Sequence, residues 1–89
     1  VVRARADLNA GTPREASLQA RVALECVLEE LDPARLGALR TELEADRGSV
    51  IEAAGSALAG EPPARLQEQV ASAVGRMERA LRRHRARAP

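Results

Sequence analysis

The feature that most constrains the fold of this chain is the absence of Phe, Tyr and Trp from all 89 residues. The large apolar side chains are 11 Leu, seven Val, one Ile and one Met, whereas 19 residues are Ala. Alanine favours helices but contributes little apolar area. A chain this short also buries only roughly 60–65% of its unfolded surface. The helices must therefore approach closely, and association with a second chain would add buried area that the domain itself lacks.

Helix start and stop signals divide the chain into four predicted helices. Thr12-Pro13 and Asp32-Pro33 each place a capping residue before a proline at the first helical position. Gly48 and Gly60 are typical helix stops, and Pro62-Pro63 marks the last break. No run alternates between apolar and polar residues as a strand would. The sequence thus predicts the all-α class, a small four-helix bundle with a short third helix. The predicted helices span residues 13–31, 33–46, 50–59 and 63–85.

The same signals predict one domain with loose ends. Residues 1–11 show no sustained period and are expected to form a flexible arm, partly docked through Leu8. Residues 12–85 form the helical domain, and residues 86–89 a frayed tail. An alternative is one continuous helix over residues 33–59, because Gly48 and Ser49 lower helix stability without forbidding a helix. The chain begins without Met, which suggests a piece of a longer protein.

The predicted helix over residues 13–31 has apolar residues on two opposite sides. One side carries the core positions around Leu24 and Leu31, and the other carries Leu18, Val22 and Cys26 at intervals of four. One helix can bury both sides only if other helices surround it or if a second chain covers one of them. We therefore expect Leu18, Val22 and Cys26 to form a partner interface. In the predicted third helix, Leu58 is assigned to the buried side, with Ile51 beside it.

Charge is distributed unevenly, although the formal net charge is only +1. Residues 1–75 carry eight Arg and 12 acidic residues, whereas residues 76–89 carry six Arg and one acid. The six predicted contacts for an anion or an acidic partner are Arg76, Arg79, Arg82, Arg83, Arg85 and Arg87. Such a cluster could equally be a solvated face that complements the helix dipole. The lack of aromatic residues for base stacking argues against nucleic acid as the main ligand.

No catalytic, metal-binding or cofactor-binding pattern stands out. Cys26 and His84 are the only candidates for thiol chemistry, and Cys26 lies in mid-helix, far from the helix N-terminus that would activate it. The Glu-x-x-His motif of bundle metal sites is absent, as is a glycine-rich phosphate loop followed by Lys. We therefore expect no enzyme activity, metal or cofactor. A single cysteine excludes an internal disulfide and suits a reducing, cytoplasmic compartment.

These observations predict a non-enzymatic protein–protein interaction or dimerisation module. Its partner would be another protein chain, for which a second copy of this chain is one candidate, and it would belong to a larger regulator, effector or assembly. The exclusive use of Arg as the basic residue, together with the alanine content, suggests a GC-rich bacterial genome. No apolar run approaches the roughly 20 residues of a membrane span. The alternative function is a nucleic-acid-binding accessory domain that uses the C-terminal Arg cluster on phosphates.

Overall fold

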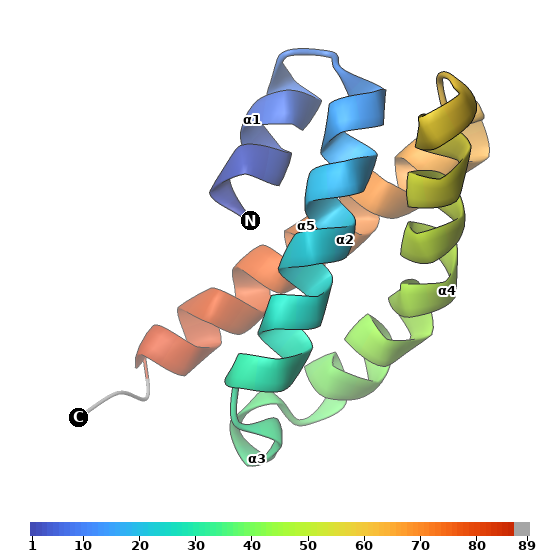
Figure 1. The fold of residues 1–89 in the computed structure, drawn as a ribbon. Helices are drawn as coiled ribbons and strands as arrows, with labels where there is room; N and C mark the ends of the chain where they lie inside the picture. The colour runs from blue at the N-terminus through green and yellow to red at the C-terminus, as the bar shows by residue number, and fades with distance from the viewer. Residues whose placement is uncertain (87–89) are drawn as a thin grey trace.

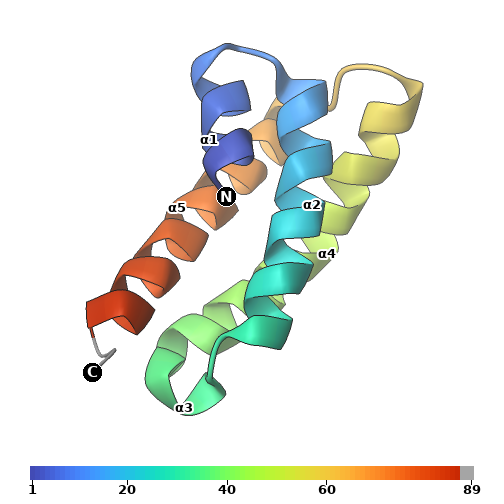
Figure 2. The ribbon, with the colours of Figure 1, turned by 60° about the vertical axis from the view of Figure 1, so that its left-hand side comes forward.

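The computed structural model describes residues 1–86, which form five helices (Figure 1). The helices are α1 (Val2–Asn9), α2 (Pro13–Glu30), α3 (Pro33–Leu36), α4 (Ala38–Ala59) and α5 (Ala64–Ala86). Helices α2 and α4 lie side by side and antiparallel, α5 crosses behind them, and α1 packs against α2 and α5 (Figures 1 and 2). The predicted all-α bundle is confirmed, and no strand occurs among these residues.

The N-terminal segment differs from its prediction as a flexible arm. Residues 2–9 form helix α1, in which Ala4 is completely buried and Arg5 binds Glu78 of α5. Val1 and Leu8 pack against the same core while remaining partly exposed. The sequence pattern missed this helix because its one fully buried side chain is an alanine. Its position depends on contacts with residues distant in the sequence.

The turn between α1 and α2 uses Gly11 and Thr12 in distinct ways. Gly11 has φ of +72°, a conformation that glycine adopts without steric cost. The predicted capping role of the Thr12 side chain is wrong, because its hydroxyl donates to the Asp7 carbonyl oxygen at 3.0 Å instead. The same carbonyl also accepts from the Thr12 amide at 3.0 Å, so both groups of Thr12 close the C-terminal end of α1. The predicted start of the helix at Pro13 is confirmed.

The predicted helix break at Gly48 is also wrong. Helix α4 runs through Gly48 from Ala38 to Ala59, and the chain breaks at Gly37, where φ is +56° and ψ is −131°. Leu43 and Val50, seven residues apart, are both buried on one side of α4. Their packing offsets the cost of roughly 1 kcal/mol for a glycine inside a helix. The alternative of one continuous helix is therefore correct at Gly48 and wrong at Gly37.

The other predicted helix ends are close to those observed. The Asp32 side chain accepts a hydrogen bond from the Ala34 amide at 3.0 Å, so its predicted capping role is confirmed. Helix α5 begins one residue later than predicted, and it includes Ala86, which was assigned to the frayed tail. Residues 87–89 of that predicted tail lie outside the described residues.

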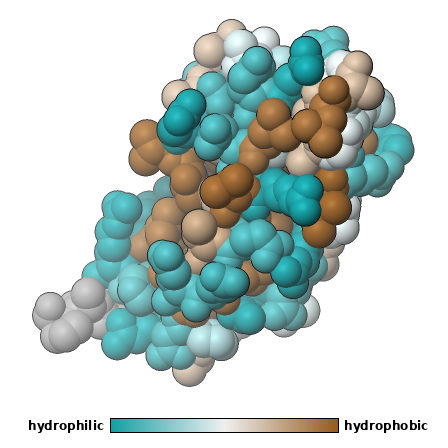
Figure 3. Space-filling model, viewed as in Figure 1, coloured by the Kyte–Doolittle hydropathy of each residue, from teal (hydrophilic) through white to brown (hydrophobic). Residues whose placement is uncertain are grey.

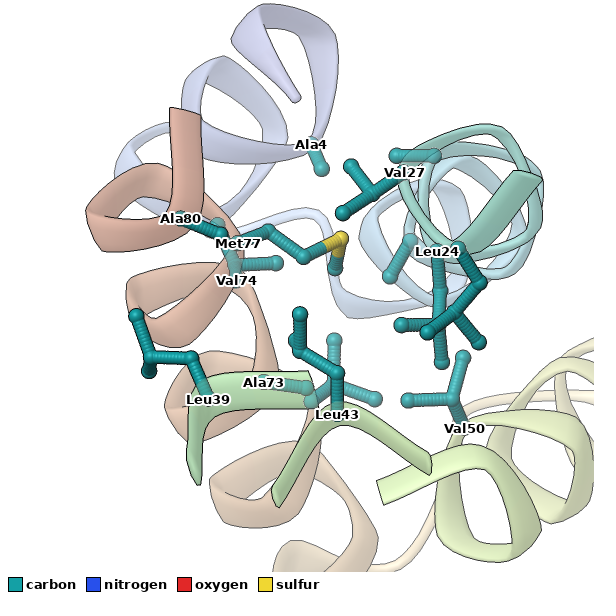
Figure 4. Close-up of a cluster of buried hydrophobic side chains, with 14 of the residues drawn as sticks. Ala4, Leu24, Val27, Leu39, Leu43, Val50, Ala73, Val74, Met77 and Ala80 are labelled. Carbon is teal, nitrogen blue, oxygen red and sulfur yellow. The ribbon is translucent and has the colours of Figure 1, made fainter. Parts of the chain in front are cut away.

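The core lies where α2, α4 and α5 meet (Figure 4). Its large side chains include Leu24 from α2, Leu43 and Val50 from α4, and Met77 from α5, each no more than 1% exposed. Between them the helices approach through alanines. The alanines at 0% exposure are Ala4, Ala16, Ala20, Ala53, Ala57, Ala73 and Ala80. The close approach expected from the composition is thus realised.

Candidate protein-interaction face

The second apolar side of α2 remains uncovered in the single chain. Leu18 is 38% exposed, Val22 is 61% exposed, and Cys26 is also exposed. These residues lie on the outer side of α2, opposite Leu24, which is 1% exposed. The chain therefore does not use α2 as a central helix surrounded by the others, the alternative that would have buried these three residues.

Helix α4 contributes two further apolar side chains beside α2. Arg47 of α4 binds Glu25 of α2 through two bonds, of 2.9 and 2.7 Å, and so marks the flank of α4 that faces α2. Ile51 and Leu58 follow Arg47 by about one and three helical turns, so they share that flank. They are 40% and 75% exposed. The prediction that Leu58 is buried is wrong. Helix α4 packs through Val50 and Ala57, which the same prediction also buried, and Leu58 lies about 100° further round the helix than Ala57, on the exposed flank.

We call Leu18, Val22, Ile51 and Leu58 the α2–α4 apolar face. In Figure 3, apolar surface runs from the N-terminal end of α1 across α2 toward the C-terminal end of α4. Among residues 1–86, the only other exposed large hydrophobic side chain is Val2 of α1. Helix α5 contributes none, although it is the longest helix described. The exposed apolar area is therefore concentrated on one side of the molecule.

A groove between α1 and α2 adjoins this face. Its volume is about 400 Å³, and Val2, Val22, Cys26, Leu31 and Leu81 contribute to its walls. Val22 belongs to both features, so the groove continues the α2–α4 apolar face toward the N-terminus. Cys26 lines the groove and does not lie among the buried residues of the core.

Some arginines of the C-terminal cluster bind groups elsewhere in the chain, and others are exposed on α5. Arg76 binds both carboxylate oxygens of Asp46 at 2.6 Å and so joins α5 to α4. This hydrogen bonding raises the pKa of Arg76 above its ordinary value. Arg83 donates to the Leu36 carbonyl oxygen at 2.9 Å, at the end of α3. Arg79, Arg82 and Arg85 are exposed on α5, and Arg87 lies outside the described residues.

A second ion pair fastens α1 to α5. Arg5 donates from Nε and Nη2 to the two carboxylate oxygens of Glu78, at 3.0 and 2.7 Å. Hydrogen bonding from Arg5 holds the pKa of Glu78 below its ordinary value, although partial burial opposes the shift. A carboxylate with a lowered pKa stabilises the fold above its unfolded pKa, and this contribution disappears as the pH falls through the folded value.

We therefore expect Glu78→Gln to lower stability at neutral pH and to flatten the loss of stability below about pH 4.3, the ordinary pKa of Glu. Both side chains are partly exposed, so the effect at neutral pH should be about 1 kcal/mol or less. Urea unfolding measured across the acid range checks this, with exposed Glu68→Gln of α5 as the control. Parallel acid profiles for the wild type and Glu78→Gln would contradict it.

His84, Cys26 and the acidic side chains are the remaining candidates for a metal or chemical site among the described residues. Within the described part of the chain, no three His, Cys, Asp or Glu side chains gather to hold a metal ion. The Nδ1 atom of His84 is buried without a hydrogen-bond partner, whereas Cys26 opens to the groove. None of the helices in residues 1–86 combines the length and apolarity needed to cross a bilayer. Comparisons with protein-family models, curated proteins and solved structures find no match for this chain.

Proposed function

We propose that this chain is a non-enzymatic protein–protein interaction module that binds its partner through the α2–α4 apolar face. The supporting observation is the concentration of exposed aliphatic side chains on that side. Soluble monomers rarely leave extensive contiguous apolar surface exposed without an interaction to serve. Val22 and Leu58 are 61% and 75% exposed, so burial of each by a partner would contribute roughly 1–2 kcal/mol.

The proposal extends to the setting of the module. A small helical domain with an exposed apolar side suits a larger regulator, effector or assembly, in which a partner chain would cover that side. The Arg-only basic residues and the 19 alanines support a bacterial source, and the single cysteine supports a cytoplasmic one. Both arguments come from the amino-acid composition and do not depend on the geometry of the α2–α4 apolar face.

The nucleic-acid alternative has weaker support from the geometry. Two arginines of the predicted cluster already bind protein groups: Arg76 binds Asp46, and Arg83 donates to the Leu36 carbonyl oxygen. Arg79, Arg82 and Arg85 are left as exposed cations on the described part of α5. Proteins that bind nucleic acid commonly add aromatic side chains on which bases stack, and this chain has none.

The test compares which proteins co-purify with three tagged forms of the chain. The forms are the wild type, the face variant Val22→Glu/Leu58→Glu, and the control Ala71→Glu/Ser72→Glu on the exposed surface of α5. We expect at least one protein, or an untagged copy of the chain itself, to be retained by the wild type and the control and lost from the face variant. Quantitative mass spectrometry measures retention, and circular dichroism verifies that all three forms keep their helices.

One outcome of this comparison would contradict the proposal. If every protein retained by the wild type is also retained by the face variant, the α2–α4 apolar face is not the binding surface and the proposal is wrong. Both changed positions are largely exposed, so the substitutions should leave the free energy of unfolding within about 0.5 kcal/mol of the wild type.

A further inference from the structure

Helix α1 depends on its neighbours to stay folded. It has eight residues, whereas isolated helices shorter than roughly 12–15 residues are marginal in water. Its one buried side chain is Ala4, which contributes little apolar area, and Val2 is 83% exposed. The stability of α1 must therefore come from its contacts with α2 and α5.

Those contacts are loosely packed. Hollows of about 400, 250 and 180 Å³ border α1, the first toward α2, the second toward α5 and the third beside Leu8. Side chains that face a hollow meet solvent in place of other side chains, so they bury less apolar area. The ion pair between Arg5 and Glu78 is partly exposed, so water screens it and its contribution is small. Few strong interactions therefore oppose the separation of α1 from the other helices.

Helix α1 covers an apolar flank of α5. Glu78, which binds Arg5, marks this flank, and Val74 precedes Glu78 by about one helical turn on the same side. Val70 lies one further turn back and shares a hollow with Leu8 of α1. Val70 and Val74 are 1% and 0% exposed. Removal of α1 from this flank would therefore expose two valines that the closed chain hides.

The fold allows α1 to move while the other long helices stay together. The core side chains Leu24, Leu43 and Met77 come from α2, α4 and α5, and α1 adds no large side chain to the buried core. Helix α1 is joined to α2 by a turn in which Gly11 has φ of +72°. Glycine changes its backbone angles at low steric cost, so this turn can act as a hinge.

We propose that α1 is a strap that opens about the turn at Gly11 while α2, α4 and α5 remain folded, and that its opening uncovers Val70 and Val74 on α5. The inference goes beyond the proposed function and concerns a different surface from the α2–α4 apolar face. In the closed chain, α5 shows no exposed large hydrophobic side chain among the described residues. The position of α1 thus decides whether α5 presents an apolar surface.

Thiol labelling with iodoacetamide tests the opening in the full chain. In a Cys26→Ser background, Ala4→Cys reports on α1 and Val74→Cys on the flank beneath it. The matched controls are Ala73→Cys, between α5 and α4, and Val50→Cys in α4, since all four parent residues are no more than 1% exposed. We expect Ala4→Cys and Val74→Cys to react at least roughly 100-fold faster than their controls, because local openings require far less free energy than global unfolding.

The urea dependence of labelling separates local from global opening. The slope of an opening reaction with urea scales with the surface that it exposes. We therefore expect the slopes for Ala4→Cys and Val74→Cys to be less than about half of those for the two controls. Circular dichroism and urea unfolding verify that the four variants are folded and similarly stable.

Hydrogen exchange of the unmodified chain gives the same comparison without substitutions. The amides of Arg5 and Ala10 are hydrogen-bonded to the carbonyl oxygens of Val1 and Ala6. They should exchange at least roughly 100-fold faster than the amide of Ala73 in α5, relative to their intrinsic rates, and with a smaller urea slope.

Two outcomes would overturn the inference. Equal labelling rates and equal urea slopes at all four positions, or equal protection of the α1 and α5 amides, would mean that α1 separates only when the whole chain unfolds. Fast labelling of Ala4→Cys together with slow labelling of Val74→Cys would mean that α1 unravels without uncovering α5. Either result would leave the proposed function untouched, because the α2–α4 apolar face contains no residue of α1 or α5.

Discussion

Leu43→Ala is expected to lower the free energy of unfolding by about 3 kcal/mol, because it leaves a cavity where α2, α4 and α5 meet. Leu43 is 0% exposed and stands among the largest side chains of the core (Figure 4). A domain of 89 residues has a total stability of roughly 4–13 kcal/mol. The loss is therefore a large fraction of the whole, and no aromatic side chain is present to move into the space. Urea unfolding followed by circular dichroism measures it.

Leu58→Ala is the matched control for this prediction. It removes the same atoms from the same helix, but Leu58 is 75% exposed, so stability should change by about 0.5 kcal/mol or less. Both variants should be measured at a concentration too low for self-association, since a dimer would add its own contribution to stability. Equal losses for Leu43→Ala and Leu58→Ala would mean that the buried side of α4 has been assigned wrongly.

Ala73→Leu is expected to destabilise the fold by about 3 kcal/mol for the opposite reason. Ala73 is 0% exposed on the side of α5 that meets α4, close to Leu39 and Leu43 (Figure 4). Three additional carbon atoms have no space there, so α4 and α5 must separate or their side chains must leave favoured rotamers. Thermal and urea unfolding should both report the loss, with no gain from the higher apolar content.

The control for overpacking is Ala71→Leu. Ala71 lies two residues earlier on α5 and is exposed, so the added carbons should enter solvent and change stability by about 0.5 kcal/mol or less. Unchanged stability in Ala73→Leu would show that the alanine contact between α4 and α5 can open without cost. The requirement for close helix approach in this core would then be wrong.

The class of fold was predictable because its signals are local. Asp32 and Pro33 begin a helix by satisfying or removing backbone donors, and those effects act within one turn. The apolar stripe of α5, which includes Leu66, Val70 and Met77, has a helical period and is buried as that period predicts. The uncovered side of α2 was visible for the same reason, since Leu18 and Val22 lie opposite the core positions.

The sequence pattern failed where distant contacts compete with local preference. Gly48 is a typical helix stop, but the burial of Leu43 and Val50 against other helices keeps α4 unbroken. Leu58 directly follows the buried Ala57, so its exposure could be assigned only once the packing of α4 against α2 and α5 was known. Likewise, Arg76 appeared to belong to a basic stripe, yet the fold brings Asp46 within 2.6 Å of its guanidinium.

The sequence by itself therefore determined that the chain is helical, roughly where most of its helices begin and end, and that α2 carries apolar residues on two sides. Only the tertiary structure decided that residues 2–9 form a packed helix, that α4 continues through Gly48, and that α2 and α4 share one exposed apolar face. The physical reason is the separation along the chain over which each interaction acts. Capping and periodicity act between residues a turn or two apart, whereas burial and ion pairing depend on partners that only the folded chain brings together.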